Sequence, residues 1–173
     1  MTSFILVHGA WHGGWCWHKV AARLVAMGHR VEAPDFPGHG RDETPIADVT
    51  LESIVARICE TIDRVPERAV LVGHSYGGAI ISQASELRPE KVKALVYLTA
   101  ILAGDGQTPG GALAGDKEGV GPSHLDYAPD GKSATVKKEA LKPVFYGEIA
   151  ATRTSPMPQN ACVRRPPRDW SRR

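Results

Sequence analysis

A serine flanked by glycines stands where a predicted strand meets a predicted helix. The segment GHSYG at residues 73–77 matches the pattern G-x-S-x-G, directly after a short apolar run and before a helical pattern. Such a turn strains the backbone at the serine and crowds the residues two before and two after it, so glycine is favoured at both places. Ser75 is therefore the candidate nucleophile, and Gly73 and Gly77 are expected to shape the turn.

Two other interpretations of this segment are weaker. A G-x-S-x-G string can arise by chance in a glycine-rich chain, but the predicted strand before it and the helix after it supply the context that the motif requires. A phosphate-binding loop is excluded because Ala79 and Ile80 stand where such a loop needs Lys and Ser or Thr. The segment favours nucleophilic chemistry over nucleotide binding.

A second short segment completes the candidate site. His8, Gly9 and Ala10 follow the apolar run at residues 4–7. In a parallel sheet this loop lies beside the serine turn, so the N–H of Ala10 can join the N–H of Tyr76 in binding an oxyanion. The alternative is a plain turn that ends the strand, and the His8 side chain is expected to be structural rather than catalytic. A serine with two amide donors points to acyl transfer.

Alternating strand and helix patterns position both segments. Short apolar runs predict strands at residues 4–7, 30–33, 68–72 and 92–98. Apolar residues at helical spacing predict helices at residues 14–27, 51–65 and 76–87. This order indicates an α/β fold with a parallel sheet of about four strands, right-handed crossovers and flanking helices.

Composition divides the chain into three parts. Residues 1–104 are the predicted core with the serine turn, and residues 105–149 an irregular lid, because eight glycines lie between residues 104 and 131. The lid ends in a predicted helical stretch from residue 133 to about 146. Residues 150–173 hold six arginines, four prolines and one acid, a charge of +5 against −3 for the rest of the chain. This basic tail is predicted to be disordered.

Composition also excludes several classes of function. A net charge of +2 over 173 residues gives no argument for nucleic-acid binding. Cys16, Cys59 and Cys162 lie far apart without a ligand-like spacing, so neither a metal site nor a disulfide framework is expected, and a cytoplasmic location fits. A secretory leader and an apolar run of roughly 18 residues are both missing, so no membrane association is predicted.

Three stretches resemble the α/β-hydrolase superfamily, within it the branch of plant methylesterases, hydroxynitrile lyases and related bacterial esterases. They are FILVHGAWHGGWCW at residues 4–17, GHRVEAPDFPGHG at 28–40 and LVGHSYGGA at 71–79. The resemblance implies that Ser75 is the nucleophile and that Ala10 and Tyr76 form the oxyanion hole. It also implies that Trp11, Tyr76 and lid residues border the acyl pocket, without a metal or an organic cofactor.

The chain departs from this family where the catalytic base and acid should follow. The triad order is Ser, then Asp or Glu, then His, but the 26 residues after Gly147 contain no histidine and a single aspartate. His124 is the one histidine after Ser75, and Asp105 follows the predicted strand at residues 92–98. These two are weak candidates for base and acid, with a solvated loop histidine as the alternative.

The tail suggests an origin for this departure. Its Arg, Pro, Thr and Ser content is what a shifted reading frame in GC-rich DNA would produce, so the chain is expected to be C-terminally truncated. The alternative is a genuine basic tail that binds an acidic partner.

The leading prediction is therefore a serine hydrolase that acts on a small carboxylic ester through Ser75. The alternative is a catalytically impaired remnant that binds a small acyl ligand or a protein partner. Hydroxynitrile lyase activity would also need the missing histidine. Without a following strand, residues 92–98 would form an unprotected sheet edge, which predicts self-association.

Overall fold

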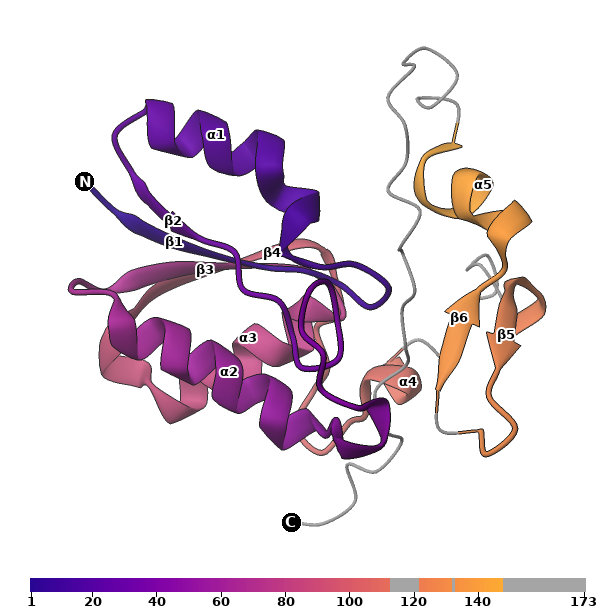
Figure 1. Ribbon diagram of the computed structural model, residues 1–173. Helices are drawn as coiled ribbons and strands as arrows, with labels where there is room; N and C mark the ends of the chain where they lie inside the picture. Colours follow the sequence, from indigo (N-terminus) through magenta and orange to yellow (C-terminus); the bar gives the residue numbers. More distant parts are fainter. Residues whose placement is uncertain (113–121, 132, 148–173) are drawn as a thin grey trace.

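Four parallel strands form the central sheet. The computed structural model describes residues 1–112, 122–131 and 133–147. The strands are β1 (Ser3–Val7), β2 (Arg30–Glu32), β3 (Ala69–Ser75) and β4 (Val92–Ala100). They lie in the order β2-β1-β3-β4, and every neighbouring pair is parallel (Figure 1). The predicted α/β class with a parallel sheet of four strands is confirmed.

Helices join consecutive strands. The connections are η1 (Gly14–Trp17) with α1 (His18–Ala26), η2 (Ile46–Asp48) with α2 (Leu51–Arg64), and α3 (Gly77–Leu87) with η3 (Pro89–Lys91). In Figure 1, α2 and α3 lie side by side on one face of the sheet and α1 lies on the other. The helix predicted at residues 14–27 is thus divided, because its first turn is a 3-10 helix.

The core lies between the sheet and the α2–α3 layer. Helix α2 begins with a capping box in which Thr50 and Ser53 each accept the other's backbone N–H. It buries Ile54, Ile58 and Ile62, which recur every four residues and therefore share one face. Buried side chains of β1, β3 and α3 complete this apolar cluster. Because the serine turn joins β3 to α3, it is anchored at both ends in the core.

The opposite face and one edge of the sheet are less covered. Helix α1 contributes no buried residue. Strand β4 pairs only with β3 in the described part of the chain, and its Val96 and Leu98 are 44% and 48% exposed. The expected exposed edge is therefore present among these residues, and self-association through it stays a prediction.

The segment after β4 is more regular than the sequence suggested. It contains α4 (Pro109–Ala112), η4 (Pro122–His124), β5 (Leu125–Tyr127), β6 (Ala134–Val136), η5 (Lys138–Ala140) and α5 (Leu141–Phe145). The helix predicted from residue 133 is wrong at its start, because β6 there pairs with β5 as an antiparallel hairpin. Gly131, at φ 67°, makes the reversal. The predicted disordered tail lies outside the described residues.

Close packing fixes the turn between β3 and α3. A Cβ at Gly73 would lie 2.6 Å from the carbonyl oxygen of Gly77, and one at Gly77 would lie 2.6 Å from that of Val7. These neighbours are backbone atoms and cannot swing away like a side chain. The turn and the end of β1 are therefore in direct backbone contact.

Substitution of Gly77 tests this contact. We expect Gly77→Ala to lower the free energy of unfolding by about 1–3 kcal/mol, because the added methyl overpacks a site closed by backbone. The matched control is Gly110→Ala in α4, where a Cβ meets nothing within 4 Å, so its stability should stay the same or rise slightly. Urea unfolding of both variants measures the difference; equal midpoints would contradict the contact.

Candidate functional site

Ser75 lies in a left-handed backbone conformation at the end of β3. Its φ is 53°, whereas Tyr76 has returned to right-handed helical angles and α3 begins at Gly77. A non-glycine residue in this region costs about 1–3 kcal/mol of backbone strain, and such residues concentrate at functional sites. The side chain is half-buried. The sharp strand-to-helix turn expected around the serine is present.

The loop after β1 lies directly against Ser75. Val7 pairs with Gly73, so the carboxyl ends of β1 and β3 meet side by side. A Cβ built on Gly9 would lie only 2.8 Å from the Cβ of Ser75, which leaves room for glycine alone. Ala10 follows in the same loop and is half-buried.

Two backbone amides near the serine have no partner in the described structure. Neither the N–H of Ala10 nor that of Tyr76 donates a hydrogen bond among the described residues. The Tyr76 amide comes just before α3, where the first N–H groups of a helix have no intrahelical acceptor. Within the described ranges, the adjoining loops therefore hold a serine hydroxyl and two N–H groups that donate to no described residue.

His8 ties this loop into the core. Its side chain is completely buried, with Nδ1 2.8 Å from the carbonyl oxygen of Gly9 and Nε2 3.2 Å from the backbone N of Phe36. The ring packs on the Phe36 ring at a centroid distance of 3.9 Å. Burial lowers the pKa of His8 to about 3. The structural role expected for His8 agrees with these contacts.

Two further histidines lie beside the turn. The rings of His12 and His74 meet edge-on at 6.3 Å, and Gly9 packs against His74. Burial lowers the pKa of His12, and burial together with the His12 charge lowers that of His74, so both imidazoles are favoured in the neutral form. Neither makes a hydrogen bond with Ser75 among the described residues.

The segment around the β5–β6 hairpin closes over the loop after β1. The indole N–H of Trp11 donates to the carbonyl oxygen of Ala134 at 3.0 Å. Phe145 of α5 meets the His12 ring edge-on at 4.8 Å and lies 6.4 Å from the Trp11 ring. Trp11 itself has a φ of 63°. The segment is thus attached to the loop that carries Ala10.

The two weak candidates for base and acid, His124 and Asp105, are both exposed. Asp105 is exposed and lines a hollow of about 550 Å³ that Ser82 and Gln83 of α3 and Tyr97 of β4 also border. His124 is exposed in η4, and its carbonyl oxygen accepts the N–H of Lys137. No hydrogen bond joins either residue to Ser75 within the described ranges. The described residues therefore bring the serine turn and the loop of Ala10 together, but none of their histidines or carboxylates is hydrogen-bonded to Ser75.

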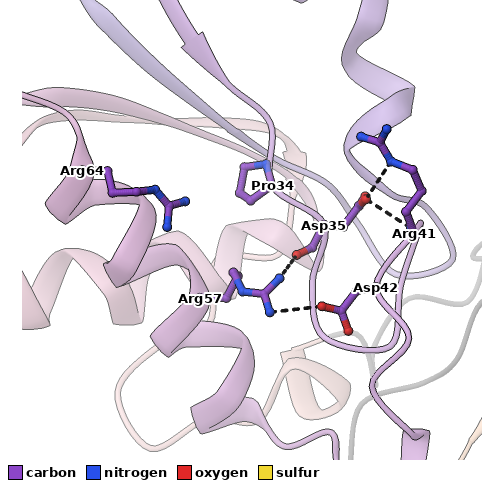
Figure 2. Close-up of a pocket in the computed structure, with 6 residues that line it drawn as sticks. All are labelled: Pro34, Asp35, Arg41, Asp42, Arg57 and Arg64. Carbon is purple, nitrogen blue, oxygen red and sulfur yellow. Dashed lines mark hydrogen bonds and ion pairs between the residues drawn. The ribbon is translucent and has the colours of Figure 1, made fainter.

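A second hollow, of about 420 Å³, is lined by charged residues of the loop after β2 and of α2 (Figure 2). Asp35 accepts the backbone N–H of Gly14 at 2.6 Å and of Arg41 at 3.2 Å. Arg57 donates to the carbonyl oxygen of Asp35 and to the Asp42 carboxylate, both at 3.1 Å. The Asp35 carboxylate therefore holds the backbone at Gly14 and Arg41 in place. Sequence reasoning had missed this network, although the acids sit among turn residues typical of such bonds.

The described residues contain no group of three or more His, Cys, Asp or Glu side chains placed to hold a metal ion. No helix in this part of the chain is long and apolar enough to cross a membrane.

Comparison with known proteins identifies the family. Residues 4–173 match the Alpha/beta hydrolase family. Methylesterase 1 of Arabidopsis thaliana is 45% identical over 103 residues, which is 57% of this chain and 39% of that protein. A pyrethroid hydrolase of Sphingobium wenxiniae is 34% identical over 167 residues, 92% of this chain and 60% of that protein. The chain thus spans less than two thirds of the length of either curated relative.

A solved structure agrees with these matches. The pyrethroid hydrolase of Sphingobium faniae JZ-2 superposes with a TM-score of 0.80 at 30% identity, covering 94% of this chain and 66% of that one. The relatives of this chain are esterases and hydrolases, and its sheet and serine turn have the geometry described above. The chain belongs to the α/β-hydrolase family.

Proposed function

We propose that this chain carries the nucleophile and the oxyanion hole of a serine ester hydrolase that acts on small carboxylic esters. The observation that carries the proposal is the strained Ser75 at φ 53°, packed against the loop that bears Ala10. In this proposal residues 1–104 form the catalytic core and residues 105–149 a lid over it. The relatives support the reaction class, because they are esterases and hydrolases.

The proposed reaction has two halves. The Oγ of Ser75 bonds to the ester carbonyl carbon and loses its proton, and the carbonyl oxygen, now negative, accepts hydrogen bonds from the N–H groups of Ala10 and Tyr76. The carbon–oxygen bond to the alcohol then breaks, and the alcohol leaves with a proton. Water attacks the acyl-serine in the same way and releases the acid.

Proton transfer limits this reaction in the described chain. No histidine is hydrogen-bonded to Ser75 among the described residues, so the hydroxyl proton passes to solvent. An oxyanion hole with binding alone typically retains roughly 10³- to 10⁴-fold catalysis over water. The lack of a histidine hydrogen-bonded to Ser75 among the described residues favours a second candidate, a protein that binds a small acyl ligand without turning it over.

A fluorophosphonate probe tests the role of Ser75. We expect slow covalent labelling, located on Ser75 by mass spectrometry of the digested protein, because the probe needs the same nucleophile and oxyanion donors. Ser75→Ala should abolish the labelling, whereas Ser85→Ala, on α3 but outside the site, should leave it unchanged. Labelling that persists in Ser75→Ala would remove Ser75 from its proposed role.

Hydrolysis of an activated aryl ester tests the base. We expect near-background rates in the full chain, and a change of less than tenfold in His124→Ala, equivalent to about 1.4 kcal/mol, because His124 is exposed and makes no hydrogen bond with Ser75 among the described residues. His18→Ala, which removes another exposed histidine, is the matched control. A loss of about 100-fold in His124→Ala alone, with an unchanged circular dichroism spectrum, would identify His124 as the base.

A further inference from the structure

The two bonds of His8 determine which ring nitrogen carries the proton. The backbone N–H of Phe36 can only donate, so Nε2 of His8 must accept. In a neutral imidazole the proton then lies on Nδ1, which donates to the carbonyl oxygen of Gly9 at 2.8 Å. Both nitrogens are committed, and the side chain has no polar atom left to serve elsewhere.

The surroundings keep this arrangement fixed. The ring is fully buried between Phe36 at 3.9 Å and His39 at 5.7 Å, measured between centroids. His12, His39 and Asp35 are the titratable groups that act on it. With its pKa lowered to about 3 by burial, the imidazole remains neutral over the range in which ester hydrolases are assayed, so Nε2 stays an acceptor.

The peptide unit between Gly9 and Ala10 transmits this constraint. Its C=O belongs to Gly9 and its N–H to Ala10, and in a planar trans peptide the two groups point in opposite directions. Gly9 has no Cβ, as its contact with the Ser75 side chain requires. A bond that holds the Gly9 oxygen therefore also sets the direction of the Ala10 N–H.

We propose that His8 is a positioning residue that aims the Ala10 N–H at the oxyanion by donating from Nδ1 to the Gly9 carbonyl oxygen. This inference rests on the proposed function of Ser75 and Ala10. The hydrogen bonds of the His8 ring go to Gly9 and Phe36, so His8 acts through one peptide plane. The bond to Phe36 serves to fix the tautomer.

Two substitutions separate the two bonds of His8. In His8→Asn the new side-chain amide nitrogen can occupy the place of Nδ1 and donate to Gly9, but the variant loses the acceptor for Phe36. His8→Gln places its amide group near the position of Nε2 and keeps the Phe36 bond, but it loses the donor to Gly9. Each variant loses one buried hydrogen bond, so urea unfolding should give similar midpoints for both.

The first readout does not depend on activity. In ¹H–¹⁵N spectra of the full chain, the Ala10 amide should shift and exchange its hydrogen faster in His8→Gln, and stay close to its wild-type position in His8→Asn. If the Ala10 amide responds equally in both variants, or in neither, the inference is overturned whatever the labelling shows.

The second readout is the rate of fluorophosphonate labelling at Ser75. We expect His8→Gln to lose about 10- to 100-fold and His8→Asn less than about threefold, on the scale of a misplaced oxyanion donor. The loss should appear in the labelling rate at saturating probe, and the probe concentration that gives half of that rate should stay unchanged. Equal losses in the two variants would reduce His8 to core packing. If the two variants show the expected Ala10 response but the wild-type chain is not labelled, the proposed function is refuted, whereas the hold of His8 on the Ala10 amide is established.

Discussion

The direct backbone contact between the β3–α3 turn and the end of β1 is the constraint on which the site depends. Gly77 approaches the carbonyl oxygens of Val7 and His8 so closely that a Cβ would lie 2.6 and 2.8 Å from them. Helix α3 can start there only if the chain reverses sharply after β3. Ser75, at φ 53°, makes that reversal. The same contact brings Gly9 against the serine.

The rest of the molecule holds the two sides of this contact in place. Strands β1 and β3 pair in register from Ser3 with Ala69 to Val7 with Gly73, and Ile5 and Leu71 are fully buried between the sheet and its helices. Side chains of α2 and α3 complete that apolar layer. The burial of this layer offsets the strain of Ser75. The free energy that its buried apolar area contributes to folding is far larger than the cost of one strained residue.

The loop after β1 is held by a different kind of interaction. It has few apolar side chains of its own to bury, and hydrogen bonds fix it instead: His8 holds Gly9, and the Asp35 carboxylate holds Gly14. Trp11 and Phe145 attach the hairpin segment to the same loop. The hairpin segment is therefore tied to the loop that carries Ala10.

The elements with strong periodicity could be predicted from the sequence. The helix expected at residues 51–65 is observed at Leu51–Arg64, and the strand expected at 92–98 at Val92–Ala100. The strand before the serine was predicted too short, because Gly73 and His74 looked like turn residues yet still pair with β4. The β5–β6 hairpin was missed because each strand has three residues, although Asp130-Gly131 is a known hairpin signal.

Only those parts of the candidate site that lie within one short stretch of sequence could be predicted. The turn at Ser75 and the loop at Ala10 follow from motifs, since each comes directly after a strand of a parallel sheet. The bonds of His8 to Phe36 and of Trp11 to Ala134 join residues 28 and 123 positions apart. Such pairings depend on how loops fold over the sheet, which no local pattern in a single sequence specifies.

The most direct measurement is a crystal structure of the full chain after its reaction with a fluorophosphonate has been driven to completion. We expect a phosphonate on Ser75 Oγ, with one phosphoryl oxygen about 2.7–3.1 Å from the backbone nitrogens of both Ala10 and Tyr76. A phosphoryl oxygen turned to solvent, with the Ala10 amide directed elsewhere, would contradict this expectation, and so would an adduct on another side chain.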